Sequence, residues 1–340
     1  MDILEQFGLD NDQALLLFSM QRFLVQVDIG SEKNKSLQQK KEEWLHVWEN
    51  GIEDLLADSS NRIKLIKEEK LLIEKCEDVV NNCGKVKTPL YLILLELSLF
   101  TPYFSMEGFK WKFYELVTMD KKVANYNLIR FSSMLEIDES FISRYKKSFK
   151  KSLRSLSGFY TKMLVGAGLG SVLVAITAGL ALPYVASLVA PAGLAGAAAI
   201  NAGLAALGGG AIAAGGFGMA GGITVIVGGG SIFGALNGMA LGAILGDSSD
   251  FALREGAKLE VIMREIILIA QKDVRFAQEM IKNQQMVIKK LEAELAELKF
   301  NEKENKTRIK NLAKSIEYLR NSLKNSQKSL EEDSYIKEDK

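Results

Sequence analysis

Apolar residues recur at helical spacing through the first part of the chain. Leu16, Met20 and Phe23 lie three or four positions apart, which places them on one face of a helix. The apolar stretch that begins at Pro89 is only roughly eleven residues long and contains Glu96, so it is typical of a buried helix rather than a membrane span. The pattern predicts a soluble helical domain over residues 1–142, with helices over 13–27, 36–57, 62–80 and 89–100 and two more before residue 140.

The pattern changes between Met163 and Gly246. These 84 residues contain no Asp, Glu, Lys, Arg or His and hold 22 of the chain's 29 glycines. A hydrocarbon layer about 30 Å thick needs roughly 20 helical residues, so this apolar run is long enough for roughly two to four crossings. The best candidate spans are 163–182 and 223–245, whereas 184–222 is mostly Gly and Ala and suits close packing. We expect a membrane region of transmembrane helical hairpins, because backbone polar groups in lipid must bond internally.

Five glycines near the end of the apolar run are spaced by four. Each step of four advances about 40° around a helix, so the glycines trace a groove where a second backbone can approach. Gly lowers helix stability by about 1 kcal/mol at each position, which favours a packing purpose over chance in a Gly-rich tract. We therefore expect a helix-packing groove at Gly230, Gly234, Gly238, Gly242 and Gly246.

A heptad pattern follows the apolar run, from Val274 to Leu330. Apolar residues fill most a and d positions, which indicates a long coiled coil over residues 251–335. Polar Glu302 and Asn305 interrupt the pattern and either loosen one long helix or form the turn of a helical hairpin. We expect oligomerisation through Ile281, Ile288, Leu291, Leu295, Leu298, Ile309, Leu312, Ile316, Leu319 and Leu323.

Together these patterns predict an all-α protein, since alternating strand patterns are scarce and the chain has only four prolines. The expected parts are a soluble sensor or regulatory domain (1–142), a basic juxtamembrane helix (143–162), a Gly-rich hydrophobic membrane region (163–246) and the coiled coil (251–335).

Charge is balanced overall but unevenly distributed. The 43 Lys and Arg against 42 Asp and Glu give no global attraction to nucleic acid. Seven cations and no anions lie in the nineteen residues before the apolar run, a pattern typical of the cytoplasmic side of a membrane span. We name this segment the basic collar and expect it to bind anionic lipid or phosphate, the alternative being a solvated helix face: Arg144, Lys146, Lys147, Lys150, Lys151, Arg154 and Lys162.

The candidate chemistry is sparse. Residues 216–221 match G-x-G-x-x-G, but no strand unit precedes them and the next acidic residue is Asp247, so we reject a dinucleotide site. His46 is the sole histidine, and Cys76 and Cys83 have neither zinc nor disulfide spacing. We expect no enzyme activity, cofactor or metal. The N-terminus lacks a basic region before an apolar stretch, so we expect no signal peptide and a cytoplasmic origin.

Two resemblances add to these expectations. Residues 86–145, with a buried helix, an exposed turn and the stretch 134–139, resemble the small helical TerB-like domains. The order of helical domain, basic collar, Gly-rich region and coiled coil, with its Gly-Gly-Gly and Gly-x-x-x-Gly runs, resembles bacterial effectors of anti-phage abortive infection, such as the Hailong-system channel effector. That resemblance implies a homo-oligomer that permeabilises the inner membrane in response to a nucleotide, an oligonucleotide or a signalling protein.

Two alternatives remain at this point. A soluble α-helical pore-forming toxin that releases a hydrophobic hairpin fits the same pattern. A non-channel membrane adaptor that uses its coiled coil to recruit a partner also fits. In each case the partner implied by the apolar run is a lipid bilayer, and the expected location is the inner membrane with a cytoplasmic N-terminal domain.

Overall fold

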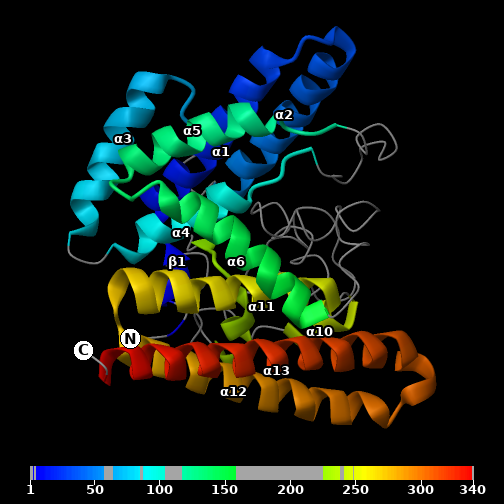
Figure 1. Cartoon of the computed structure of the whole chain (residues 1–340). Helices are drawn as coiled ribbons and strands as arrows, with labels where there is room; N and C mark the ends of the chain where they lie inside the picture. The colour runs from blue at the N-terminus through cyan, green and yellow to red at the C-terminus, as the bar shows by residue number, and fades with distance from the viewer. Residues whose placement is uncertain are drawn as a thin grey trace, which may run out of the picture.

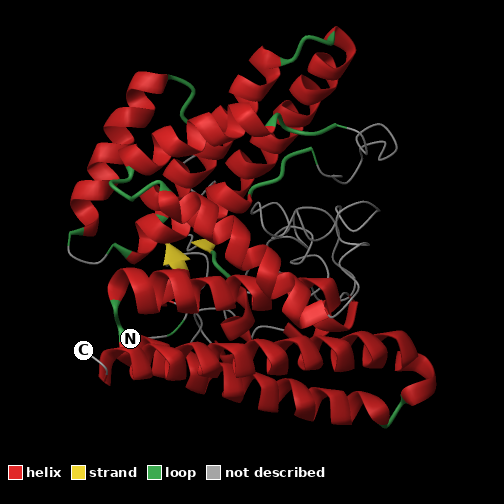
Figure 2. Cartoon of the chain, viewed as in Figure 1, coloured by secondary structure: helices red, strands yellow, loops and turns green. Residues whose placement is uncertain are grey.

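A computed structural model of the chain describes residues 3, 5–56, 64–84, 87–103, 117–157, 225–237, 241–247 and 249–338. These residues are almost entirely helical (Figure 2), which confirms the all-α prediction. The only strands among them are β1 (Gly8–Leu9) and β2 (Val225–Ile226), which pair antiparallel. The end of the apolar run is therefore joined to the N-terminus of the chain.

The N-terminal helices form the upper part of the molecule in Figure 1. Asp10 caps the first long helix by accepting from the Gln13 N–H at 2.9 Å, while the Gln13 side chain accepts from the Asp10 N–H. The buried Asp28 carboxylate then ties this helix to Lys41, at 2.7 Å from its Nζ, and to the hydroxyl of Tyr103. The elements are η1 (Glu5–Phe7), α1 (Asn11–Ser31), α2 (Lys35–Leu56), α3 (Glu69–Cys83), α4 (Thr88–Leu99), α5 (Lys121–Met134) and α6 (Ser140–Ser157).

The C-terminal part is built around a helical hairpin. Helices α12 (Val274–Lys299) and α13 (Glu302–Glu338) lie side by side and turn at Phe300 and Asn301 (Figure 1). The turn comes just before Glu302 and Asn305, which lie at the start of α13, so the polar interruption of the heptad pattern marks a helical hairpin and residues 274–338 do not form one long helix. Against this hairpin pack a 3₁₀-helix, η6 (Gly230–Asn237), and the helices α10 (Leu241–Asp247) and α11 (Ser249–Val261), which continues into a π-helix, η7 (Ile262–Gln271).

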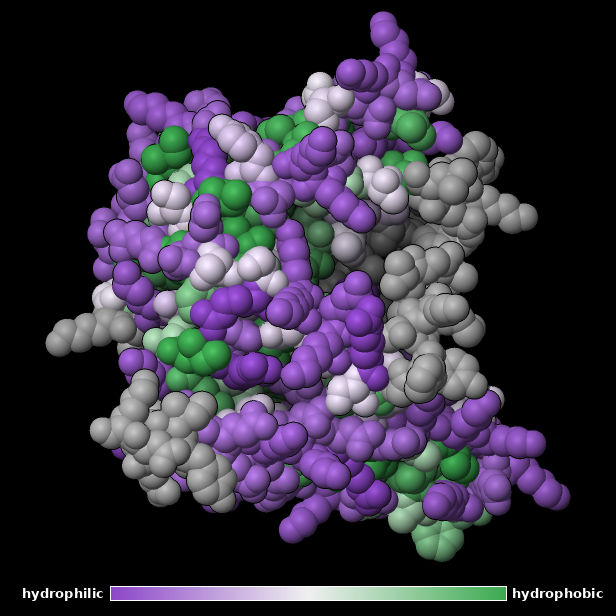
Figure 3. Space-filling view, viewed as in Figure 1, coloured by the Kyte–Doolittle hydropathy of each residue, from purple (hydrophilic) through white to green (hydrophobic). Residues whose placement is uncertain are grey.

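One hydrophobic cluster runs through both parts, from Ile3 in the N-terminal segment to Leu319 in α13. Figure 3 shows a mostly hydrophilic face, with hydrophobic side chains gathered near the hairpin turn. Phe300, at that turn, is 88% exposed. The core therefore joins the N-terminal helices and the hairpin, and Phe300 at the hairpin tip is the most exposed aromatic side chain among the described residues.

The candidate span over residues 223–245 needs correction. Residues 225–237 and 241–247 form β2, η6 and α10, and the strand and the 3₁₀-helix exclude a continuous α-helix over the candidate span. Gly228 and Gly229, at φ +63° and +83°, start the turn between β2 and η6. Of the helices that the structure describes, none combines the length and the apolar composition that a bilayer crossing requires. The other candidate span, 163–182, and the rest of the run up to residue 224 lie outside the described residues.

Candidate functional site

The apolar run enters the helical body through a tight glycine turn. A Cβ atom on Gly229 would lie 2.6 Å from the backbone oxygen of Glu255, and one on Gly228 would meet side-chain atoms of Leu92 and Ile262. Both glycines also have positive φ, a conformation that other residues adopt at a cost. Only glycine fits at these two positions, so this end of the run is shaped to the surface formed by α4, α11 and η7.

A buried ionic network holds the same turn, and we call its members the buried clamp: Glu96, Lys258, Glu255, Ser231 and Gly228. Lys258 Nζ lies 2.8 and 3.0 Å from the two oxygens of Glu96 and 3.4 Å from Glu255 Oε1. The Gly228 N–H donates to Glu96 Oε1 at 2.8 Å, and the Ser231 hydroxyl donates to Glu255 Oε2 at 2.8 Å. The clamp thus connects the apolar run to α4 and α11.

The ionisable side chains of the clamp are deeply buried. Glu96, Glu255 and Lys258 are 3%, 4% and 2% exposed. Burial disfavours the charged form of Lys258, but attraction to Glu255 and Glu96 outweighs it, so the pKa of the ammonium is raised above its usual value. The sequence showed Glu96 only as an interruption of an apolar stretch. An isolated acidic residue within an otherwise apolar helix was the available signal for a buried ionic partner.

The glycines of the expected groove divide between two short helices. Gly230 and Gly234 lie in η6, Gly242 and Gly246 lie in α10, and Gly238 falls outside the described residues. The expected single helical groove is therefore absent from the described residues, because η6 is wound as a 3₁₀-helix and is separate from α10. A Cβ on Gly242 would meet the Glu294 carboxylate of α12, and one on Gly246 would lie 3.4 Å from Arg308 Cβ of α13. These two glycines allow α10 to approach the hairpin closely.

Small polar residues of α13 complete this contact. Ser315 Oγ donates to the Leu245 carbonyl at 3.2 Å, and Asn311 donates to the Gly246 carbonyl at 3.0 Å. About two turns further along α13, Ser322 Oγ donates to the Gly256 carbonyl of α11 at 2.9 Å. The sequence analysis missed these residues, although Ser315 and Ser322 are spaced by seven beside the heptad positions, a spacing that indicates a second packing face.

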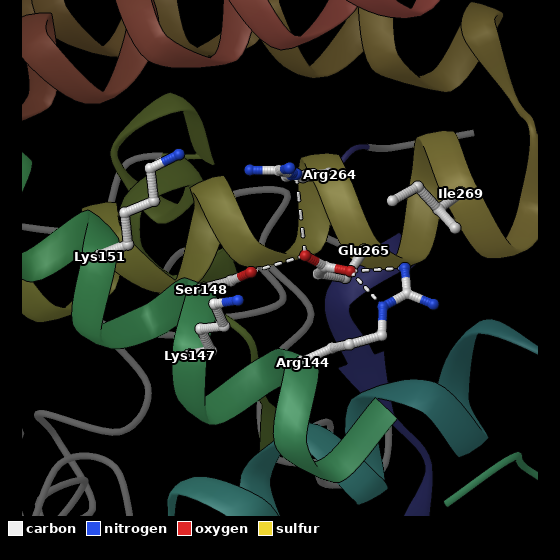
Figure 4. Close-up of a pocket in the computed structure, with 7 residues that line it drawn as sticks. All are labelled: Arg144, Lys147, Ser148, Lys151, Arg264, Glu265 and Ile269. Atoms are coloured by element: carbon white, nitrogen blue, oxygen red, sulfur yellow. Dashed lines mark hydrogen bonds and ion pairs between the residues drawn. The ribbon is translucent and has the colours of Figure 1, made fainter. Parts of the chain in front are cut away.

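The basic collar lies on α6, which packs against α11 and η7. Arg144 is paired with the buried Glu265, at 2.8 Å from Nε and 2.6 Å from an Nη atom to the same oxygen. Ser148 Oγ donates to the other Glu265 oxygen at 2.6 Å (Figure 4). Lys147 and Lys151 project beside this pair at the edge of a cavity of about 350 Å³.

The remaining collar residues lie elsewhere. Lys146, Lys150 and Arg154 are exposed and do not line this cavity, and desolvation lowers the pKa of Lys146. Arg154 lies on the same stripe of α6 as Lys147 and Lys151, one turn further along. Lys162 lies outside the described residues. The sequence analysis did not connect the collar with Arg264, Glu265 or Ile269, which line the same cavity from η7, because 120 residues separate the two helices along the chain.

The residues expected to mediate oligomerisation lie mainly inside one chain. Ile288, Leu291, Leu312, Ile316 and Leu319 are buried. Ile281, Leu295, Leu298 and Leu323 pack against the same core, and Ile309 is half-buried. The hairpin and its contacts with α10 and α11 cover most of their apolar surface, so oligomerisation through them stays a prediction.

The described residues offer little catalytic chemistry. They contain no group of three or more His, Cys, Asp or Glu side chains suited to a metal ion. His46 lies at the surface, with its Nε2 3.4 Å from the Asn50 amide. Burial raises the pKa of the Cys76 thiol to about 12 and also raises that of Cys83, which disfavours the reactive thiolate at both positions.

Comparison with protein-family models, with curated proteins and with solved structures found no match for this chain. The buried clamp and the cavity beside the basic collar are the two arrangements in the described residues that bear on function.

Proposed function

We propose that this protein is a membrane effector whose apolar run permeabilises a bilayer after release from a closed helical body. The resemblance to abortive-infection effectors implies the bacterial inner membrane as the target, a nucleotide or protein as the signal, and anti-phage defence as the setting. The described residues represent the closed form in this proposal, with the last part of the run packed against α4, α11 and the α12–α13 hairpin.

The buried clamp is the observation that carries the proposal. Burying a lysine and two glutamates costs several kcal/mol in desolvation, and an apolar core of the same volume is often as stable or more stable. A network of this kind suits a contact that must form in one arrangement and separate in another. Its position is also informative, because Gly228 and Ser231 belong to an 84-residue run without ionisable side chains.

The same packing favours a toxin-like version of the effector, in which a hydrophobic segment is stored and then released. Val227, Ile232, Phe233, Leu241 and Leu245 are buried in the helical body. An uncharged segment stored in this way is shielded from water until a membrane is available. Leaving the body would expose these side chains, and burial in hydrocarbon would then recover about 25 cal/mol per Å² of apolar surface.

Homo-oligomerisation belongs to the released form in this proposal. The heptad residues of α12 and α13 cover one another in the closed chain, so they become available to a second chain only when the hairpin opens. The glycine positions of α10 that now contact the hairpin would be uncovered in the same step.

A vesicle assay tests the proposed function. The full-length protein is purified, added to dye-loaded vesicles of phosphatidylethanolamine and phosphatidylglycerol, and followed by dye release and by flotation with and without carbonate washing. We expect carbonate-resistant association together with dye release, and membrane depolarisation on expression in bacteria. Carbonate-resistant association without dye release or depolarisation would overturn the effector and favour the adaptor. Absence of membrane association would overturn both.

A further inference from the structure

The cavity between α6 and η7 has the size and charge of a small anion-binding site. Its volume is about 350 Å³, near the lower end of the range of roughly 300–1,000 Å³ for small-molecule sites. Four cations and one carboxylate line it, together with Ser148 and Ile269: Arg144, Lys147, Lys151, Arg264 and Glu265. The formal charge of the lining is therefore positive by three.

The single carboxylate is already occupied. One Glu265 oxygen accepts from Arg144, and the other accepts from Ser148 and lies 3.8 Å from Arg264 Nε. Glu265 is only 4% exposed, so it acts as a buried anchor that fixes the positions of the residues around it. Its ion pairs are with Arg144 and Arg264, not with Lys147 or Lys151. Lys151 interacts electrostatically with Glu260 of α11, and neither lysine has an ion pair within 4 Å in the described part of the chain.

The winding of η7 brings a cation and an apolar side chain to the same cavity. Arg264 and Ile269 are five residues apart, and an α-helix would direct them about 140° apart. The π-helix is wound more loosely, with hydrogen bonds five residues apart, and both side chains line the cavity. π-helices are rare and occur often at functional sites. Ile269 is 42% exposed and offers an apolar surface beside the charges.

We propose that this cavity binds a phosphate-bearing ligand. Lys147 and Lys151, one helical turn apart on α6, and Arg264 on η7 would contact phosphate oxygens from two sides, and Ile269 would contact the organic part of the ligand. A fully ionised phosphate matches an excess of three positive charges better than a carboxylate does. The phosphate belongs either to a soluble molecule or to an anionic lipid headgroup, which present the same chemistry to these side chains.

Binding stabilises the closed body, because the cavity and the buried clamp share one helical segment. Ile262, the first residue of η7, is one of the two residues that a side chain at Gly228 would meet. A ligand that joins α6 to η7 therefore holds the surface on which the glycine turn rests. This consequence for release rests on the proposed function, whereas binding itself does not require that the protein permeabilise membranes.

Two variants with the same loss of charge test the site. Lys147→Ala/Lys151→Ala removes the cavity cations, and Lys150→Ala/Arg154→Ala removes two exposed cations from other positions of the same helix. Calorimetric titration of the full chain uses pyrophosphate and ATP as soluble probes. Binding to an anionic lipid headgroup is measured by flotation with phosphatidylglycerol vesicles, with phosphatidylcholine vesicles for comparison. Melting temperatures without any probe show whether each variant is folded.

We expect the affinity of the cavity variant for one class of probe to fall by about tenfold or more. The affinity of the control variant for the same probe is expected to change by less than about twofold. Loss confined to pyrophosphate or ATP identifies a soluble ligand, and loss confined to vesicles identifies a lipid headgroup. The site is overturned if both variants weaken binding equally, since the collar then acts only through its general charge, or if the folded parent binds neither class of probe. Should the cavity variant unfold, Arg264→Gln on η7 replaces it and must produce the same selective loss.

Discussion

Lys258 is the residue on which the closed arrangement depends most directly. Its ammonium lies between Glu96 on α4 and Glu255 on its own helix, and all three residues are almost fully buried. Removing one member of a buried pair leaves an uncompensated charge and costs about 3–5 kcal/mol, whereas replacing both members with uncharged groups of similar volume is often close to neutral. Comparing the single and double variants therefore shows whether these side chains stabilise the fold through their charges or only by filling space in the core.

We predict that Lys258→Met destabilises the fold by about 3–5 kcal/mol and that Glu96→Gln/Lys258→Met destabilises it by less than the sum of the two single variants. The Gln amide oxygen can still accept from the Gly228 N–H, so the double variant keeps this contact. Urea unfolding followed by circular dichroism measures all four proteins. Strict additivity in the cycle would show that Glu96 and Lys258 are not coupled.

Glu260 provides a pH-dependent contribution. It lies on α11, where Asn325 of α13 donates to it at 2.9 Å. Burial raises the pKa of this carboxyl to about 7. The hydrogen bonds from Ser152 and Asn325 and the positive charge of Lys151 lower the pKa but do not offset the effect of burial. In the unfolded chain the pKa is about 4.3. Between these values the folded state holds a proton that the unfolded state has lost, so the stability contributed at this site falls as pH rises from about 4.3 to about 7.

We therefore predict that Glu260→Gln stabilises the fold at pH 8 by up to about 3 kcal/mol relative to the parent, and has little effect at pH 4, where both states of the parent are protonated. Urea midpoints at half-unit pH intervals measure this difference. The exposed Glu304 of α13, changed to Gln, serves as the control and is expected to leave the pH dependence unchanged. A difference between Glu260→Gln and the parent that stays constant from pH 4 to pH 8 would contradict the raised pKa.

At the scale of single residues, sequence reasoning identified the basic collar but not its partners. Arg144, Lys147 and Lys151 were recognisable from local charge density, since no anion lies among them. Glu265 and Arg264 belong to a helix more than a hundred residues later, and nothing local indicates that they face α6. Long-range pairing between charged side chains follows from tertiary packing, which a single sequence does not express.

Helix α13 shows how one element serves two contacts. Its heptad residues Leu312 and Leu319 are buried, and Ser315 and Ser322 on the neighbouring stripe donate to backbone carbonyls of α10 and α11. A heptad pattern requires only that an apolar stripe be covered, and an antiparallel neighbour in the same chain covers it as well as a second chain does. The helices were therefore predictable, whereas the choice between hairpin and long coiled coil depended on how the polar break at 301–306 folds.

We predict that Ser322→Leu destabilises the fold by about 1–3 kcal/mol, because a Cβ on the facing Gly256 would already lie 3.5 Å from Ser322 Cβ and there is no room for a larger side chain. Ser322→Ala removes only the hydrogen bond to Gly256 and is expected to cost about 0.5–1.5 kcal/mol. The exposed Lys324→Leu is the control, with an expected change within about 0.5 kcal/mol. Equal stability of the Leu variants at 322 and 324 would mean that α11 and α13 do not pack closely.

For the whole molecule, the sequence predicted the helical class and the position of the uncharged run, and the described structure adds how the end of that run is held. Val225 and Ile226 pair with the N-terminus, Gly228 and Ser231 join the buried clamp, and Gly246 contacts the hairpin. The expected helix over 223–245 failed because hydropathy measures transfer into lipid and does not register competition from a packed protein surface. In the described structure, the glycine turn and the hydrogen bonds to buried polar side chains hold this segment against the protein surface.

In the proposed mechanism, release of the run requires α10 to leave the hairpin, and a disulfide between the two elements would prevent it. A Cβ at Gly246, the last residue of the run, would lie 3.4 Å from Arg308 Cβ, close to the roughly 3.5–4.5 Å between the Cβ atoms of a disulfide. We predict that oxidised Gly246→Cys/Arg308→Cys loses dye release in the vesicle assay and that a reducing agent restores it.

The controls for this lock are the two single variants, which are expected to release dye under oxidising and reducing conditions alike. Gly256→Cys/Ser322→Cys provides a second lock, between α11 and α13, with Cβ atoms 3.5 Å apart. If only α10 leaves the helical body, the protein with the α11–α13 disulfide still releases dye. If the whole hairpin opens, either disulfide abolishes dye release. Full dye release by the oxidised Gly246→Cys/Arg308→Cys protein, with the disulfide verified by mass spectrometry, would show that the run acts without leaving the hairpin and would overturn the closed-body mechanism.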